Sequence, residues 1–456
     1  MVKKLSISSL RYFVLLSFLA FAFSCSSPGS KEESTVASAD TTVPTVTTIS
    51  PADGTTNKAV TSTISITFNK SIEPRNVTAS TSENCSGTMQ LSVDGFNSCI
   101  PAVVSYDSSR KIYTLTAGSS SSALELFSST KHQLKVTTSV KDYFSIALDS
   151  DYISDGFTTT SICTSGCAWS DTAATGLTAV SGHAVVFYLG KLWVIGGGNG
   201  SSVYSKVFSS SDGITWTDAG ASNDLSGRND HAATAFNGKL WVMGGGSNGS
   251  SLLNDVLSST DGKTWTSVSS AAAWTPRHKH SLLVFKNKMY LLGGIDNSSA
   301  KMNDVWSTSD GKTWTEITDN ATWSKRSGHA ATVFNQKIWV MGGDNGSTLS
   351  DVWYSSTDNA STWTQATTSG STWLARSGHT ATVFEGLLWV IGGNADTESL
   401  NAWSSTDGSV WTNVGAKSGE TSRSGIESGV MANRLYLIGG YTGSVHKDDV
   451  LNMVLD

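Results

Sequence analysis

The sequence predicts an all-β protein in which one four-stranded unit is repeated along the C-terminal two thirds of the chain. A pair of glycines recurs six times, with steps of 47 to 50 residues, and a Trp followed by Thr or Ser recurs six times on the same period. Every glycine pair also ends an unbroken apolar run, which is the pattern of a strand buried on both faces. Two markers that keep register over six copies indicate an internal repeat.

The two marker series are offset from each other along the chain. The glycine pairs lie at Gly196-Gly197, Gly244-Gly245, Gly293-Gly294, Gly342-Gly343, Gly392-Gly393 and Gly439-Gly440. The tryptophans are Trp169, Trp216, Trp265, Trp314, Trp363 and Trp411. The Trp series therefore begins before the first glycine pair and ends before the last.

The composition argues against nucleic-acid binding and favours an extracytoplasmic protein. Only 15% of the 456 residues are charged, the formal net charge is −6, and no Lys/Arg block is present, so we expect no nucleic-acid partner. The balance of Ser, Thr, Gly and Trp suits an extracytoplasmic β-protein.

The N-terminus has the pattern of a secretion signal. Basic residues precede the apolar run Tyr12 to Phe23, which is too short to span a membrane as a helix. The run ends in Phe21-Ala22-Phe23-Ser24-Cys25, which resembles a bacterial lipoprotein signal, with Ala22 where Leu is usual. The resemblance implies that Cys25 is lipidated and anchors the protein in the bacterial cell envelope, at the outer membrane, the surface or the periplasmic face. An ordinary signal peptide with an incidental Cys25 is the alternative.

Five cysteines are consistent with that interpretation. Assigning Cys25 to lipid leaves Cys85, Cys99, Cys163 and Cys167, which allow three pairings. In an oxidising compartment the pairs closest in sequence, Cys85 with Cys99 and Cys163 with Cys167, are the expected disulfides. The alternative is a four-Cys zinc site, but the spacings C-x13-C and C-x3-C match no usual zinc ribbon.

Three segments are expected before the repeats. Residues 1–24 are the signal peptide, residues 25–42 are a polar flexible tether, and short alternating strands over 43–160 predict a β-sandwich. Within it Ile49-Ser50-Pro51-Ala52-Asp53-Gly54, followed by Ser62 to Ile72, resembles the opening of bacterial Ig-like domains, which usually act as spacers. Residues 161–167 would form a Cys-stapled junction.

Each repeat can be divided into four strands, A to D. Strand A begins at a His, strand B is the apolar run before the glycine pair, strand C carries Val and a large side chain, and strand D carries the Trp. This order resembles the kelch repeat over residues 168–456, which implies a six-bladed kelch-type β-propeller. The C to D segments also resemble the Asp-box of sialidases, but most lack a residue between Asp and Gly, so kelch is preferred.

The propeller resemblance explains the offset of the two marker series. The last repeat ends in strand C, while Trp169 belongs to a strand D with no A to C before it. We therefore expect residues 168–172 to complete the C-terminal blade and close the ring.

Antiparallel order places the starts of strands A and the ends of strands B on one loop-rich face. Residues that recur there are interpreted as structural contacts between blades: His183, His231, His280, His329 and His379, with Arg228, Arg277, Arg326, Arg376 and Arg423. A metal site is the alternative for the five His, but ligands spread around a ring would not converge on one ion. We therefore expect no metal and no cofactor.

Less regular residues on the same face are the candidate ligand face. They are Trp274, Trp323 and Trp373, each three residues before an Arg, and Asp296, Asp344 and Asp396 in the B to C loops. Exposed aromatic rings stack on sugars or anchor proteins. The alternative is that each Trp fills the gap between two blades.

No catalytic constellation emerges from the sequence. Galactose oxidase is a copper enzyme with a kelch propeller, and its copper site needs a Tyr-Cys crosslink, whereas no Cys follows Cys167 here. The predicted function is a monomeric, lipid-anchored envelope protein that presents its propeller to a protein or a glycan and meets the membrane only through its anchor. The alternative is a carbohydrate-active enzyme of the kelch epimerase type, acting on sialic acid.

Overall fold

The computed structural model describes residues 40–455, apart from 60–62, 82–84, 94, 97–98, 120–121, 124–125, 127–129, 160–166, 221, 224, 248–250, 370–372 and 395–398. These residues form β-strands and one 3-10 turn, η1 (Pro74–Asn76), which confirms the all-β class. The predicted signal peptide, most of the tether, Cys25 and Cys163 lie outside the described residues. Within the described part of the chain, no helix has the length and apolar character needed to cross a membrane.

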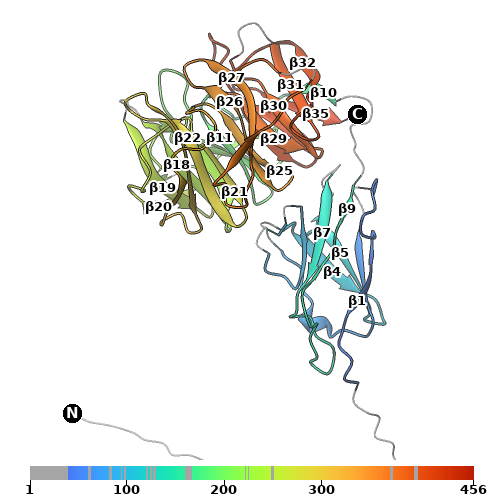
Figure 1. Cartoon of the computed structure of the whole chain (residues 1–456). Helices are drawn as coiled ribbons and strands as arrows, with labels where there is room; N and C mark the ends of the chain where they lie inside the picture. The colour runs from blue at the N-terminus through green and yellow to red at the C-terminus, as the bar shows by residue number, and fades with distance from the viewer. Residues whose placement is uncertain are drawn as a thin grey trace, which may run out of the picture. The chain divides into compact units, whose positions relative to one another are not determined.

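The first domain is a sandwich of two antiparallel sheets (Figure 1). One sheet has the order β1 (Val46–Ser50), β2 (Ile64–Phe68), β5 (Ile112–Ser119) and β4 (Ala102–Tyr106), and β6 (Ser122–Ala123) pairs with β5. The other has β3 (Met89–Ser92), β7 (Lys131–Val136) and β8 (Tyr152–Ile153), and β9 (Phe157–Thr158) pairs with β7. Alternate residues of β2 face inward, so Ile64, Ile66 and Phe68 pack in one core with Leu134 and Val136 of the opposite sheet.

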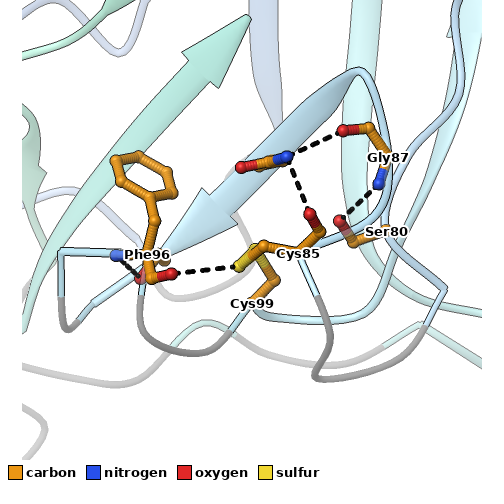
Figure 2. Close-up of a disulfide and its surroundings, with 7 residues drawn as sticks. Ser80, Cys85, Gly87, Phe96 and Cys99 are labelled. Atoms are coloured by element: carbon orange, nitrogen blue, oxygen red, sulfur yellow. Dashed lines mark hydrogen bonds between the residues drawn. A yellow bond between two sulfur atoms is a disulfide. The ribbon is translucent and has the colours of Figure 1, made fainter. Parts of the chain in front are cut away.

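A disulfide joins Cys85 and Cys99, one of the two pairs expected from the sequence (Figure 2). The segment beside it is fixed by hydrogen bonds, since the amide of Gly87 donates to Ser80 Oγ at 3.1 Å. Closing a loop of this length stabilises a fold by restricting its unfolded state.

Residues 167–455 form a set of antiparallel sheets that pack face to face around an axis, the arrangement of a β-propeller (Figure 1). Each sheet is given from its inner to its outer strand. The first is β11 (Ala184–Tyr188), β12 (Lys191–Ile195), β13 (Val207–Ser210) and β14 (Thr217–Asp218), and the second is β17 (Ala232–Phe236), β18 (Lys239–Ser247), β19 (Leu252–Ser259) and β20 (Thr264–Ser269). The third is β21 (Ser281–Phe285), β22 (Lys288–Ile295), β23 (Lys301–Thr308) and β24 (Thr315–Thr318), and the fourth is β25 (Ala330–Phe334), β26 (Lys337–Asp344), β27 (Thr348–Ser355) and β28 (Trp363–Gln365). The remaining two are β29 (Thr380–Phe384), β30 (Leu387–Ile391), β31 (Ser399–Ser405), β32 (Thr412–Thr421); and β33 (Glu427–Met431), β34 (Arg434–Ile438), β35 (Val450–Leu455), β10 (Cys167–Thr172). The short strands β15 (Ser222–Asn223) and β16 (Arg228–Asn229) extend the second sheet.

The inner strands form a closed ring. Each inner strand contacts the next in the order β11, β17, β21, β25, β29 and β33, and β33 contacts β11 again. We call the sheets blades 1 to 6 in that order. The strand that precedes each glycine pair is buried on both faces, as its apolar run predicted: Leu388 and Val390 pack against blade 4, while Trp389 and Ile391 pack against blade 6.

The N-terminal strand of the propeller completes blade 6. Strand β10 pairs antiparallel with β35, so that Trp169 lies opposite Met453 and Thr172 opposite Val450. The outermost strand of this blade therefore comes from the beginning of the propeller sequence and the other three strands from its end. This is the closure that the offset of the two marker series predicts.

Candidate functional site

The centre of the propeller is framed by a closed ring of backbone hydrogen bonds at the loop-rich face. One residue from each blade donates its amide to the carbonyl of the residue from the preceding blade, at 2.7 to 3.2 Å. The six residues, in blade order, are Gly182, Asp230, Lys279, Gly328, Gly378 and Gly425. We call these residues the axial ring.

All six residues of the axial ring have left-handed backbone conformation. The four glycines have φ between 58° and 64°, and glycine adopts this conformation without steric cost. Asp230 and Lys279 have φ values of 53° and 52°, although a side chain disfavours this region by about 1 to 2 kcal/mol. Two adjacent blades therefore place opposite charges on the ring at positions where the other four blades have no side chain.

A cavity of about 250 Å³ lies at the axial ring. Its walls come from the residues just before the inner strands and just after the glycine pairs, which are the two sets of positions predicted to share the loop-rich face. Besides the ring, Asp344, Asn394, Glu427 and Tyr441 line it, and so do the five recurring histidines and four serines. The cavity is small beside typical ligand pockets of about 300 to 1,000 Å³, so it suits a small polar group or the end of a longer ligand.

The charges at the cavity come from several blades. Oδ2 of Asp230 lies 3.6 Å from Nδ1 of His278. A Cβ at Gly182 would lie only 2.8 Å from Oδ1 of Asp230, so glycine in blade 1 leaves room for this carboxylate. Asp344 forms an ion pair with Lys301 of the neighbouring blade, and the hydrogen bond from Lys301 lowers the pKa of Asp344, with smaller contributions from the amide of Gly346 and the charges of Lys301 and Lys279. The rim thus offers both anionic and cationic groups.

Glu427 adds a carboxyl group whose pKa is raised, whereas that of Asp344 is lowered. It begins β33, where the other blades have Ala, Ser or Thr directly after their His. Burial raises the pKa of Glu427 to about 8; a hydrogen bond with Thr380 works against that rise, and the negative charge of Asp230 adds to it. This shift favours the protonated carboxyl, which can donate a hydrogen bond or a proton to a molecule in the cavity.

The recurring histidines lie between blades. A Cβ on the first glycine of a pair would meet Cε1 of the His in the next blade, at 2.7 Å for Gly196 and His231 and at 3.0 Å for Gly293 and His329. Burial lowers the pKa of His329 to about 3, and the adjacent Arg326 guanidinium contributes. The other four His are shifted in the same direction, chiefly by burial. They are neutral packing residues, and in the part of the chain that the structure describes no group of His, Cys, Asp and Glu is arranged to hold a metal ion.

The recurring arginines tie strands together within and between blades. Arg326 is fully buried, pairs with Asp351 at 2.7 Å, and donates to the carbonyl of Gly342 at 2.8 Å. Its own carbonyl accepts from Gly294 of the preceding blade at 3.0 Å. The equivalent ion pairs are Arg228 with Asp255, Arg277 with Asp304 and Arg423 with Asp449. In blade 5, Arg376 makes the same bond to the carbonyl of Gly392, at 2.8 Å.

Comparison with known protein families agrees with this geometry. The model described as the KLHDC2/KLHL20/DRC7 Kelch-repeats domain matches residues 151–294 and 231–440, together more than half of the chain. The chain belongs to the kelch-repeat family. The model described as a bacterial Ig-like domain matches residues 40–159, which confirms the resemblance seen in the first domain. No curated protein matches the chain.

The three tryptophans predicted as part of a ligand face are buried in the kelch propeller. Trp274, Trp323 and Trp373 are at most 1% exposed, so the prediction that they offer rings to a ligand is wrong. The ring of Trp323 packs edge-on against Trp363 at 5.9 Å, with the guanidinium of Arg326 5.8 Å from its centre. Trp274 and Trp373 make the same contacts in their blades. Each Trp fills a gap, because a large apolar ring is better buried than exposed.

The three predicted aspartates have different positions. Asp344 lines the axial cavity. Asp296 shapes its own turn, since Oδ1 accepts from the amides of Ser298 and Ala300, both at 2.9 Å. Asp396 lies outside the described residues.

Asp230, Lys279 and Glu427 were not predicted as site residues of the kelch propeller. The sequence does carry a signal for the first two. Glycine precedes the strand A His in three copies and precedes Ile426 in a fourth, while Asp or Lys precedes the His in the other two. A side chain at a position where the repeat otherwise has glycine indicates a departure from the structural pattern. Glu427 follows the single copy in which Ile426 replaces the His.

Proposed function

We propose that this chain is a lipid-anchored protein of the bacterial envelope whose kelch propeller binds a protein or a glycan ligand at the axial cavity. A kelch-repeat domain is in general a protein-interaction propeller. The proposal that the ligand binds at the axial cavity rests on Asp230 and Lys279. Both residues are charged, both have left-handed backbone conformation, and they are neighbours in a ring whose other members are glycines.

The propeller scaffold does not require a side chain at positions 230 and 279. The ring hydrogen bonds use only backbone atoms, so glycine would serve the scaffold at positions 230 and 279 as it does in the other four blades. Sparsely populated backbone conformations cost about 1 to 3 kcal/mol each and concentrate at functional sites. The two side chains are therefore retained for what they contact in the cavity. The ligand should carry hydrogen-bonding groups that complement a carboxylate and an ammonium.

The N-terminal part of the chain supports the envelope location. The Cys85–Cys99 disulfide suits an oxidising compartment. The secretion-signal pattern ending at Cys25 supplies an anchor, and the Ig-like domain is a spacer between the anchor and the propeller.

Catalysis on a carbohydrate is the second candidate, and Glu427 is the observation that favours it. A carboxyl group with a pKa near neutrality, in a cavity that also contains a carboxylate, suits general acid-base chemistry. Epimerisation or anomerisation of a sugar needs proton transfers of this kind. The cavity would have to admit the sugar ring past the axial ring.

The decisive experiment compares three full-length proteins: the natural chain, the double variant Asp230→Gly with Lys279→Gly, and Lys312→Ala as a control in a hairpin of the opposite face. Each is applied to a glycan array and crosslinked to envelope protein extracts. We expect ligands that the natural chain and the control share and that the double variant loses. Ligands retained by the double variant would place the site elsewhere.

The enzyme candidate is tested in parallel by following sialic acid anomers by NMR with the natural chain and with Glu427→Gln. Turnover that Glu427→Gln abolishes would make the axial cavity catalytic. Absence of turnover by the natural chain would leave binding as the function.

A further inference from the structure

The Ig-like domain carries an exposed aromatic surface that its core does not need. Tyr106, Tyr143 and Phe144 are 55%, 43% and 62% exposed. The guanidinium of Arg110 lies 5.3 Å from the centre of the Tyr143 ring and donates to its hydroxyl. We call Tyr106, Arg110, Tyr143 and Phe144 the tethered face.

These four residues come from the end of β4 and the hairpin that follows it, and from a loop after β7, and the hairpin and the loop are joined at one end of the domain. Ile72 links the loops, because its amide donates to the carbonyl of Arg110 at 2.9 Å while Ile72 also forms a β-bridge with Asp142. Tyr106 lies opposite Tyr113 in the sheet, with ring centres 5.7 Å apart. The tethered face is therefore made by segments that are distant in sequence.

The loop that carries Tyr143 and Phe144 is held by a buried carboxylate. Asp142 is 2% exposed, and its Oδ1 accepts from the amides of Phe144 and Ile146 at 2.8 and 2.9 Å. Its Oδ2 lies 2.7 Å from Nζ of Lys70. This turn fixes the backbone and leaves the two aromatic rings outside.

The chain enters the domain at the same end. Nζ of Lys70, which binds Asp142, also donates to the carbonyl of Thr42 at 2.8 Å. The neighbouring Asn69 donates to the carbonyl of Val43 at 3.0 Å and accepts from the amide of Thr45 at 2.9 Å. One ammonium group thus joins the first described residues of the chain to the loop of the tethered face.

The length of chain before this point is short. Fourteen residues, 26–39, separate Cys25 from Asp40. Fully extended, such a segment spans about 50 Å at roughly 3.3 to 3.6 Å per residue. If Cys25 is lipidated, the end of the domain that holds Thr42 is the end attached to the membrane by this segment.

We propose that the tethered face rests on the phospholipid surface, with Phe144 and Tyr143 in the interfacial layer and Arg110 at the headgroup phosphates. This inference rests on the proposed lipid anchor and gives the Ig-like domain a second membrane contact. Aromatic side chains with a polar end concentrate at the membrane interface, and cations near an anionic leaflet contribute about 1 kcal/mol each.

The charges around the tethered face agree with an anionic partner. Lys111 and Lys141 are exposed near it. Two acidic residues there have partners: Glu73 binds Arg75 at 3.1 Å, and Asp107 accepts from Ser109 Oγ and from the amide of Ile112.

The test uses the full chain with Cys25→Ala, which removes the lipid, and vesicles of phosphatidylethanolamine and phosphatidylglycerol. Flotation measures the fraction of protein bound at high lipid concentration. Three proteins are compared: the Cys25→Ala parent, the same chain with Tyr143→Ser and Phe144→Ser, and the same chain with Val410→Ser. Val410 is a 52% exposed hydrophobic residue in a propeller hairpin and serves as the matched control.

We expect the parent and the Val410→Ser control to float with vesicles and the double variant to lose at least five-fold in partitioning, with unchanged circular dichroism. A parent that does not float, or a double variant that floats as well as the control, would overturn the proposal. Lipidation itself is measured separately, as the mass of Cys25-containing peptide from the natural chain, so failure of the anchor and failure of the tethered face give different results.

Discussion

The amide of Lys279 donates to the carbonyl of Asp230 at 2.8 Å, and the two residues share a left-handed backbone, with φ values of 52° and 53°. Their neighbours around the axial ring are glycines. The propeller closes through these backbone contacts, while the two side chains add charge at the centre of its loop-rich face.

Replacing both residues with glycine should stabilise the propeller. The double variant Asp230→Gly with Lys279→Gly keeps the ring hydrogen bonds and removes two strained side-chain positions, each of which costs about 1 to 2 kcal/mol. Greater freedom of the unfolded glycines offsets part of this gain. We expect the free energy of unfolding in urea to rise by about 1 kcal/mol or to stay equal. A clear loss of stability would show that the side chains serve the scaffold.

A methyl group at the hairpin glycine of blade 2 should be strongly destabilising. At Gly262, where φ is 69°, a Cβ would lie 2.0 Å from Cζ3 of Trp193 in blade 1. We expect Gly262→Ala to lower the free energy of unfolding by about 3 kcal/mol, since overpacking adds to backbone strain. The control is Gly190→Ala, because Gly190 has φ of 72° and open space around it, so only strain of about 1 kcal/mol applies. Equal effects of the two variants would contradict the packing of Trp193 against blade 2.

Removing the strand that completes blade 6 should unfold the propeller readily. Deleting residues 168–172 removes most of β10 and exposes the backbone of β35 along its length. We expect a loss of several kcal/mol and a lower thermal midpoint, because an unpaired strand edge and the uncovered core both raise the free energy of the native state. A five-residue deletion in the tether, residues 30–34, is the control. An unchanged midpoint after the first deletion would contradict the closure.

The buried histidines predict a loss of stability in acid. The pKa of His231, His329 and His379 is lowered to about 3 and that of His183 to about 4, mainly by burial, from an ordinary value of 6.5. Between pH 6.5 and pH 4 the unfolded chain binds more protons than the native chain, so stability falls as the pH falls through this range. Each histidine contributes up to about 1.4 kcal/mol per pH unit. Glu427 acts in the opposite sense, because its raised pKa of about 8 makes the native state lose stability as the pH rises from about 4.5 to 8.

The variant His329→Ile tests this account, since Ile426 already occupies the equivalent position in blade 6. Urea unfolding at pH 4.5 and 6.5 should show a smaller difference in stability for the variant than for the natural chain. An unchanged difference would contradict a neutral, buried His329.

The disulfide predicts a local loss of stability in the Ig-like domain. Replacing Cys85 and Cys99 with Ser opens a link between residues 14 apart in sequence. Loop closure of this length is worth about 3 kcal/mol. We expect the calorimetric transition of the Ig-like domain to move to lower temperature and that of the propeller to stay in place. A shift of both transitions together would mean that the two domains unfold as one unit.

The repeat made most of the propeller predictable from sequence, because backbone requirements recur at fixed positions. The glycine pairs and the apolar strands each recur where a close approach or burial on both faces demands them. Trp169 could be assigned to the last blade for the same reason. The disulfide between Cys85 and Cys99 followed from their closeness in sequence.

The site was harder to predict because it depends on departures from the repeat. Trp323 looked like a ligand-binding residue because loops are usually exposed, but its ring packs with Trp363 and Arg326 in the interior. Asp230 and Lys279 lie in segments between strands, where charged residues are common, and only the backbone ring shows that they meet at the axis. The pKa of Glu427 is raised by burial and by the charge of Asp230, and both depend on contacts between blades that are distant in sequence.

The most direct test of the central claim is the affinity of the Asp230→Gly, Lys279→Gly double variant for the ligand that the natural chain selects, measured by calorimetry beside its unfolding free energy. We expect at least a ten-fold loss of affinity, with the free energy of unfolding unchanged or raised. Undiminished affinity in a folded double variant would contradict the assignment of the axial cavity as the binding site.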